Sequence, residues 1–172
     1  MKKDYELEKK WSYSGLPCAV VATCFGHRCG YVGVPITHFL AGVGYSQHCE
    51  ELAYAHKKAM QGSIGNRGIM SVLFASTDEY RPDVVFDVHG SITYTDWGSG
   101  EYPYPSINTW WFGFDCAHAG DKADVELMDD VHRRLEEEFG PVCEDGVDRT
   151  LEYCVDECES LAEQISALTK QE

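Results

Sequence analysis

Basic side chains are scarce in this chain of 172 residues. Its 14 Lys and Arg stand against 29 Asp and Glu, which gives a formal net charge of −15 at pH 7. Residues 121–172 alone contain 17 acidic and five basic side chains, so most of the excess negative charge lies there. Binding of duplex nucleic acid requires a basic surface that neutralises phosphates, and no cluster of Lys or Arg supplies one. Long nucleic acids are therefore not expected as partners, whereas a small-molecule ligand remains compatible with this composition.

Long apolar segments are also absent. The longest apolar run, residues 16–25, is too short to cross a bilayer. The first residues mix Asp4, Glu6 and Glu8 with lysines, which is unlike a secretory signal. Because 44% of the residues are hydrophobic and 12% aromatic, a packed core is expected instead of a disordered chain. We therefore expect no membrane association and a cytoplasmic location.

The eight cysteines include no Cys-x-x-Cys pair. Cys18, Cys24 and Cys29 are six and five residues apart, a spacing that does not match a zinc knuckle. A chain of this length without a secretory signal is expected to keep its thiols reduced. Cys154 and Cys158 lie four residues apart in a helical pattern, where they are expected to act as small buried apolar residues.

Hydrophobic patterning predicts strands followed by helices. Strand signals cover residues 17–25, 29–34, 69–75, 84–88, 91–95 and 109–115. A short helix is expected over residues 46–60, followed by a glycine-rich loop at 62–68 that lacks the Lys-Ser/Thr ending of a phosphate-binding loop. After Asp121 the apolar residues recur at helical spacing, which predicts helices over residues 125–139 and 148–168.

This order of elements predicts a single α+β domain over residues 1–172. A mainly antiparallel sheet with a short helix is expected in residues 1–120, and the acidic segment 121–172 is expected to supply two amphipathic helices packed on it. The apolar residues of the last helix, from Leu151 to Leu168, alternate spacings of three and four. That seam predicts packing on the preceding helix or on the sheet, and its alternative is a subunit contact in a homo-oligomer.

Polar residues gather near the ends of two predicted strands. Asp87 and His89 share one face of the predicted strand 84–88, and Trp111 and Asp115 share one face of the strand 109–115. If these strands are neighbours with their apolar faces together, all four side chains lie on one side of the sheet. The missing side chain at Gly113 would leave room above them.

A dense polar segment follows the second of these strands. Residues 115–121 read Asp-Cys-Ala-His-Ala-Gly-Asp. The candidate catalytic residues are His89, Asp115, Cys116, His118 and Asp121, and the candidate ligand-binding residues are His38, Asp87, Tyr94 and Trp111. Simple structural roles compete with these hypotheses. Asp121 could cap the helix that follows, Asp115 could accept hydrogen bonds from turn amides, and His118 could tie a loop to the backbone.

Four segments resemble a family of small uncharacterised proteins that is common in bacteriophage genomes. They are residues 30–35, residues 88–94 (Val-His-Gly-Ser-Ile-Thr-Tyr), residues 110–121 (Trp-Trp-Phe-Gly-Phe-Asp-Cys-Ala-His-Ala-Gly-Asp) and residues 149–153 (Arg-Thr-Leu-Glu-Tyr). The family usually has a second Gly where this chain has Ser91, and Gly-His-Pro where it has Thr37-His38-Phe39. The resemblance spans roughly residues 28–165. It implies a phage origin, and hence the host cytoplasm, but it implies no particular reaction.

Three functions are compatible with these residues, and the sequence leaves open whether the protein is an enzyme. The first is binding of a small nucleotide-like ligand, including sequestration of a host signal, because the aromatic residues between Tyr94 and Phe114 offer stacking faces for a base. Another is inhibition of a host protein through the acidic helices.

The remaining function is hydrolysis of a small phosphorylated substrate. In one form, His89, Asp115, His118 and Asp121 hold a divalent metal that activates water. In another form, the thiol of Cys116 is the nucleophile and a neighbouring histidine is its base.

Overall fold

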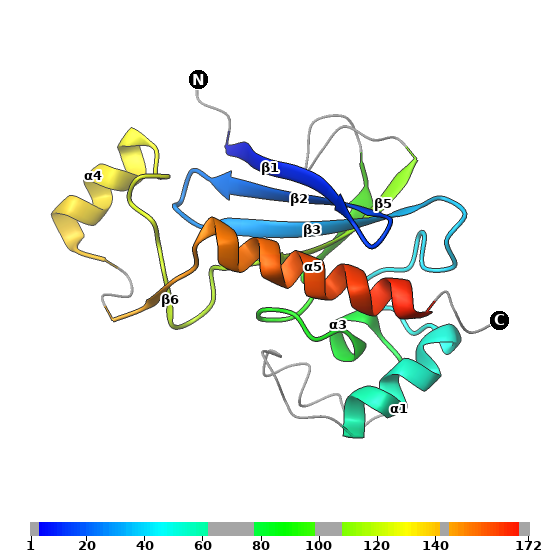
Figure 1. Ribbon diagram of the computed structural model, residues 1–172. Coiled ribbons are helices and arrows are strands. Elements are labelled where there is room, and N and C mark those ends of the chain that lie inside the picture. The colour runs from blue at the N-terminus through cyan, green and yellow to red at the C-terminus, as the bar shows by residue number, and fades with distance from the viewer. Residues whose placement is uncertain (1–3, 62–77, 99–107, 142–144, 169–172) are drawn as a thin grey trace.

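A five-stranded antiparallel sheet forms the centre of the protein in a computed structural model that describes residues 4–61, 78–98, 108–141 and 145–168 (Figure 1). The sheet order is β1-β2-β3-β5-β4. Its strands are β1 (Tyr5–Tyr13), β2 (Leu16–Thr23), β3 (Arg28–Pro35), β4 (Tyr94–Trp97) and β5 (Thr109–Asp115). Two short parallel strands, β6 (Asp121–Lys122) and β7 (Val147–Asp148), pair separately. The expected α+β class with a mainly antiparallel sheet is confirmed.

The long helix α5 (Leu151–Leu168), orange to red in Figure 1, covers one face of this sheet along β2 and β3. Its apolar face is buried, and the residues concerned are Cys154, Val155, Cys158, Leu161, Ala162 and Ile165. They share one core cluster with Trp110, Phe112 and Phe114 of β5. Gly30 in β3 permits this close approach, since a β-carbon there would overlap the Phe114 ring and lie 2.7 Å from Cys158 Sγ.

The burial of α5 confirms that Cys154 and Cys158 act as small core residues. The apolar seam of α5 is covered by the sheet of the same chain. The argument for a homo-oligomer from that seam is therefore removed. Within the described ranges, no helix has the length and apolar character needed to span a bilayer.

The opposite face of the sheet has a smaller core of its own. Trp111 is fully buried there with Ala19, Val21 and Tyr31, and Tyr94 packs against this group. The alternation predicted for β5 is therefore confirmed, with Trp110 and Trp111 on opposite faces. The expected space above Gly113 is filled, because a β-carbon at Gly113 would meet the Tyr31 ring.

The predicted strand at residues 84–88 is wrong. Residues Pro82–Val85 form the short helix α3, and the chain then runs without regular structure to the turn at Gly90. Pro82 occupies the first turn of α3, where its fixed φ suits a helix and its missing N–H costs nothing. Val84 and Val85 are buried in this helix. A short apolar run is buried equally well in a strand or a helix, so the run alone could not distinguish them.

Other boundaries differ in informative ways. The N-terminal strand β1 was not predicted, and the strand expected at 91–95 is realised as β4, which begins only at Tyr94. The helix expected at 46–60 is realised as the 3₁₀ turn η1 (Glu50–Leu52) and α1 (Ala53–Gln61). The predicted loop 62–68 and strand 69–75 fall in residues 62–77, which lie outside the described residues.

The other C-terminal helix, α4 (Asp130–Phe139), has no buried residue and does not cover the sheet (Figure 1). The expectation that both C-terminal helices pack on the sheet is thus met by α5 alone. The helix begins at Asp130 and not near residue 125 because Asp129 caps it, accepting hydrogen bonds from the N–H groups of Val131 and His132. This also corrects the alternative that Asp121 caps the helix.

Candidate functional site

Three segments meet beside the start of α5. They are the turn after α3 that contains His89 and Gly90, the loop from β5 to β6, and the first two turns of α5 together with Arg149, two residues before the helix. The side chains that meet there are polar, whereas the sheet-facing side of α5 is apolar. A buried polar cluster next to an apolar core is stable only if its polar groups are hydrogen-bonded.

Asp121 is the centre of the cluster, with a relative exposure of only 4%. Its Oδ1 accepts a hydrogen bond from Arg149 Nε at 2.7 Å, and its Oδ2 accepts from the backbone N–H of His118 at 2.9 Å and lies 2.8 Å from His89 Nε2. Burial raises the pKa of Asp121, but the bonds from Arg149 and His89 outweigh it, and the net pKa is lowered. The carboxylate therefore stays ionised at neutral pH.

His89 is fixed on both ring nitrogens and on its backbone. Its Nδ1 lies 2.9 Å from the hydroxyl of Tyr153, and its backbone N–H donates to Glu157 Oε2 at 2.7 Å. Burial, reinforced by the charge of Glu157, raises the pKa of Tyr153 to about 12, so this phenol keeps its proton. The guanidinium of Arg149 lies 4.7 Å from the centre of the Tyr153 ring. The first two turns of α5 thus hold the orientation of His89.

His118 sits against the turn at Gly90. A β-carbon on Gly90 would overlap the imidazole of His118, and Gly90 has a φ of 67°. Glycine is therefore required both by the backbone conformation and by the close approach of the His118 ring. His118 Nδ1 lies 3.7 Å from Asp115 Oδ1 and 3.8 Å from Asp121 Oδ2. Among the described residues this nitrogen is buried without a hydrogen-bond partner. The side chain as a whole is 35% exposed.

The geometry brings together three groups that bind metal ions. One donor atom each from His89, His118 and Asp121 lies within 4.8 Å of the others. Two ligands about 2.1 Å from a tetrahedral zinc ion are about 3.4 Å apart, so the 3.8 Å between His118 and Asp121 is close to such a pair. The 2.8 Å contact between His89 and Asp121 would lengthen by about 0.6 Å on the same geometry.

The surroundings of these donors match those of known metal centres. A histidine that binds a metal usually hydrogen-bonds through its other nitrogen, as His89 does with Tyr153. The carboxylate of a metal-binding Asp is usually held in the same way, as Asp121 is by Arg149.

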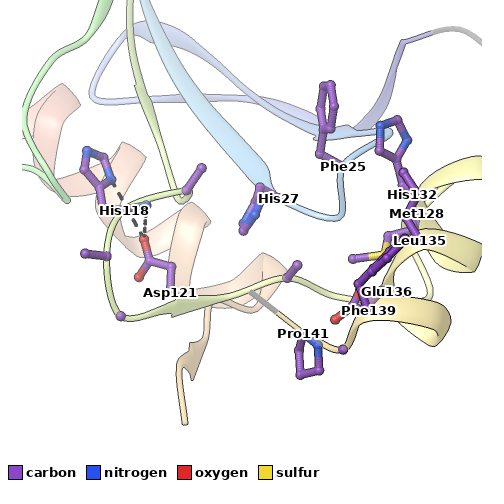
Figure 2. A pocket seen from close by; sticks show the side chains of 15 residues that line it. Phe25, His27, His118, Asp121, Met128, His132, Leu135, Glu136, Phe139 and Pro141 are labelled. Carbon is purple, nitrogen blue, oxygen red and sulfur yellow. Dashed lines mark hydrogen bonds and ion pairs between the residues drawn. The ribbon is translucent and has the colours of Figure 1, made fainter. Parts of the chain in front are cut away.

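A cavity of about 740 Å³ opens beside His118 and Asp121. Figure 2 shows these two side chains at one end, His27 in the middle and helix α4 as the far wall. The apolar part of the lining consists of Phe25, Met128, Leu135, Phe139 and Pro141, together with Ala117, Ala119 and Ala123. The cavity has the size and the mixture of apolar walls with few polar groups that suit a small ligand.

Of the predicted catalytic residues, the structure brings His89, His118 and Asp121 together, with Asp115 beside them. Asp115 binds Thr93 Oγ1 at 2.9 Å and the backbone N–H of Ala117 at 3.2 Å, so the expected acceptor role for turn amides is also present.

Cys116 follows Asp115 in sequence, but it is buried in the core and does not line the cavity. Its Sγ lies 3.5 Å from that of Cys154 in the core, and this contact together with burial raises the pKa of the Cys116 thiol far above its ordinary value. A thiol in that state is a poor nucleophile.

The candidate ligand-binding residues Trp111 and Tyr94 lie on the other face of the sheet and do not line this cavity. The physical reason is that His89 is not on a strand, so strand alternation could not assign its face. Trp111 shares a core cluster with Tyr31, and Tyr94 contacts the Tyr31 ring edge-on, with ring centres 5.4 Å apart. Their expected position beside His89 is corrected.

Asp87 and His38 are also apart from the cluster. The backbone of Asp87 exchanges two hydrogen bonds with the amide of Gln164, seven residues along α5 from Glu157 and hence about 10 Å away. His38 stacks on Phe39 in the turn after β3, and its Nδ1 accepts from the N–H of Leu40 at 3.1 Å. Burial lowers the pKa of His38, which favours the neutral ring.

Sequence reasoning missed three contributors, Arg149, Tyr153 and Glu157. Each is four residues from the next and all lie near the start of α5, which puts them on one face of the helix. The segment 149–153 was noted for its resemblance to the phage family, but nothing in it indicated which polar residues face the sheet side.

The chain matches no family model, no curated protein sequence and no solved structure. The resemblance to a phage family therefore stays a prediction, and the geometry above carries the functional argument.

Proposed function

We propose that this protein is a metal-dependent hydrolase, with His89, His118 and Asp121 as the protein ligands of one divalent ion. The observation that carries the proposal is the set of three donors within 4.8 Å, two of which also line the cavity. Two histidines and one carboxylate suit zinc and related transition metals. Three protein ligands leave a coordination position for water, which is the arrangement typical of catalytic zinc centres.

Each neighbouring residue has a role in this proposal. A divalent ion held by His89, His118 and Asp121 would lower the pKa of a bound water to about 7, and so would supply hydroxide at neutral pH. With a metal on Nε2, His89 would donate its Nδ1–H to the hydroxyl of Tyr153, and Arg149 balances the charge of Asp121. Asp115, whose Oδ1 lies 3.7 Å from His118 Nδ1, is positioned to accept a proton from the water.

The cavity points to a small substrate that carries both an apolar and an anionic part. Apolar side chains form most of its lining, whereas His27, His118 and His132 provide hydrogen-bonding nitrogens. A small phosphate ester fits that combination, because the metal and a histidine can stabilise the phosphoryl oxygens while the apolar walls take up the remainder.

Metal-stripped protein, reloaded with Zn²⁺ or Mn²⁺, provides the test. The probes are 4-nitrophenyl phosphate and bis(4-nitrophenyl) phosphate, with zinc bound per chain measured by equilibrium dialysis. We expect hydrolysis of one of these esters only with metal present. His118→Ala is expected to remove one zinc equivalent and all activity, because it deletes a ligand without cutting into the core.

The matched control is His38→Ala, a partly buried histidine that lies away from the cluster. It is expected to retain both zinc and activity. Unchanged zinc content in His118→Ala contradicts the metal site. Bound zinc with no hydrolysis of either ester contradicts the catalytic role and favours the alternative below.

A second candidate is that the cavity holds a small nucleotide-like ligand without cleaving it, as a phage protein that sequesters a host signal would. The observation in its favour is the cavity volume, about 740 Å³, which suits a ligand of that size. The stacking argument changes, since Trp110, Trp111, Phe112 and Phe114 are buried in the two cores. In this proposal Phe25 and Phe139, which line the cavity, take over the stacking role.

Calorimetric titration with adenosine monophosphate tests this candidate. Leu135→Glu places a charge in the cavity wall and is expected to weaken binding at least tenfold. Val131→Glu places the same charge on a residue of the same helix that is exposed and does not line the cavity, and it is expected to leave binding unchanged. Equal affinity in both variants contradicts a nucleotide site in this cavity.

A further inference from the structure

A second group of metal-binding side chains lies at the other end of the cavity. Cys24, Asp129 and His132 each place one donor atom within 4.8 Å of the other two. Cys24 belongs to the turn between β2 and β3, whereas Asp129 and His132 belong to the start of α4. His132 lines the cavity opposite His118, as Figure 2 shows, and none of the three residues takes part in the cluster around Asp121.

Backbone contacts fix the relative position of these donors. The N–H of Asp129 donates to the carbonyl of Cys24 at 3.1 Å, which joins the turn to the start of the helix. Asp129 Oδ1 accepts from the N–H groups of Val131 and His132 and lies 2.8 Å from His132 Nδ1. Since Oδ1 makes all of these contacts, Oδ2 has no partner among the described residues and is left for a cation. The hydrogen bonds also lower the pKa of Asp129, so the carboxylate is ionised.

The charge around Cys24 favours a cation. Burial raises the pKa of this thiol, and the carboxylates of Asp129 and Asp4 raise it further. The same two carboxylates attract a positive ion. When a metal binds, the S–H bond is replaced by a sulfur–metal bond and one proton is released to solvent.

The attachment of α4 supplies an independent reason for such an ion. This helix has no buried residue, and Val131, Leu135 and Phe139 are all exposed. Besides the backbone bond to Cys24, its start is held by the edge-on contact of the His132 ring with Phe25, whose centres are 4.4 Å apart. Apolar burial therefore contributes little to holding a helix that forms one wall of the cavity.

We propose that Cys24, Asp129 and His132 bind Zn²⁺ and thereby clamp the start of α4 to the turn between β2 and β3. A thiolate and an imidazole select zinc over magnesium and calcium, which prefer oxygen ligands. Three protein ligands leave one coordination position, and because His132 lines the cavity, the bound ion also contributes to the binding surface. This site is independent of the proposed hydrolase centre.

Cobalt substitution tests the site, because of the two donor clusters found among the described residues this one alone contains a sulfur ligand. Co²⁺ bound to a thiolate gives a strong near-ultraviolet charge-transfer absorption, whereas Co²⁺ bound by His89, His118 and Asp121 does not. We expect this absorption to saturate by two equivalents of Co²⁺ in the metal-stripped wild-type protein, which has both centres, and at one equivalent in His118→Ala, and to disappear on addition of Zn²⁺. Cys24→Ser and His132→Ala are expected to abolish it.

Two controls make the result specific. Cys49→Ser removes a thiol that also contacts a carboxylate, that of Glu51 at 3.1 Å, but belongs to no group of three donors among the described residues. It is expected to keep the full absorption. His118→Ala is expected to keep it too, so that loss of the first centre and loss of this one are separate observations.

The melting temperatures of the variants are measured without metal to verify folding. Absence of the charge-transfer absorption in the wild-type protein overturns the proposal, and so does its persistence in a folded Cys24→Ser variant. Zinc is also expected to raise the melting temperature of the wild-type protein more than that of Cys24→Ser. Equal shifts in the two proteins overturn the clamp.

Discussion

The two C-terminal helices differ in what they bury, although both are acidic and amphipathic in sequence. Six residues of α5 are buried against the sheet, whereas α4 has none, and Phe139 at its end is 77% exposed. The start of α5 supplies Tyr153 and Glu157 to the polar cluster, and Arg149 joins them from two residues before the helix. Helix α4 supplies the far wall of the cavity.

This difference separates two tasks. The packed helix provides a fixed support for His89 and Asp121, as a metal centre requires of the residues behind its ligands. The unburied helix provides a wall whose position depends on its start, at Asp129, and not on a core. Substitutions at the buried positions of α5 should therefore lower the free energy of unfolding more than matched substitutions in α4 do.

The largest expected effect sharpens this comparison directly. Leu161→Ala removes a fully buried side chain of α5 and is expected to lower the free energy of unfolding by about 2–5 kcal/mol. Leu135→Ala makes the same change in α4, where the side chain is 47% exposed, and is expected to cost less than about 1 kcal/mol. Urea denaturation of the two variants measures both values. Equal losses would show that α4 is a core helix after all.

Arg149→Met tests whether the start of α5 is tied to the metal cluster. It leaves the buried carboxylate of Asp121 without its charged hydrogen bond and is expected to cost about 1.5–3 kcal/mol at pH 7.

The pH dependence of that cost has a definite sign. Because the pKa of Asp121 is lowered in the folded state, its contribution is present above the unfolded pKa of about 3.9 and is lost as the pH falls through the folded value. The difference between wild type and Arg149→Met should therefore shrink below about pH 4. A difference that is constant from pH 7 to pH 3 contradicts the ion pair.

Gly90→Ala tests the position of His118. The added β-carbon overlaps the His118 ring, so zinc affinity is expected to fall about 10- to 100-fold, the range seen when ligand orientation is lost. Gly42→Ala is the control, since Gly42 has a similar backbone with a φ of 88° but no atom within 4 Å of an added β-carbon. Its zinc affinity should equal that of the wild type. Equal losses in the two variants would indicate general strain.

The smallest effect concerns Ser91, which has a φ of 106°, a region that favours glycine. Its hydroxyl donates to the carbonyl of Asp83 at 2.7 Å. Ser91→Gly loses that bond but relieves the strain and is expected to change stability by less than about 1 kcal/mol. Ser91→Ala loses the bond and keeps the strain, so thermal unfolding should rank it below Ser91→Gly. The reverse order contradicts the strained backbone.

The sequence predicts those strands and helices in which the buried residues recur at the spacing typical of the element. Strand β5 and helix α5 were located correctly because alternation and the three-four spacing coincide with real faces. Strand β1 was missed because it is an edge strand whose alternation is interrupted by Lys9 and by a register shift between Leu7 and Lys9.

The candidate site could be predicted in part. His118 and Asp121 share a short loop, so their proximity follows from the sequence. The partnership of His89 with Tyr153 and of Asp121 with Arg149 depends on how α5 lies on the sheet, and no local pattern encodes that. For the same reason, nothing in the spacing of Cys24 indicates His132, which reaches it only through the cap of α4.

The most direct test of the central claim is an anomalous-difference map at the zinc edge, from crystals of the metal-stripped protein soaked in Zn²⁺. The account predicts a peak within about 2.3 Å of donor atoms of His89, His118 and Asp121, and its loss in crystals of His118→Ala. A map without density among these three side chains, with the 2.8 Å contact between His89 and Asp121 unchanged, would contradict it.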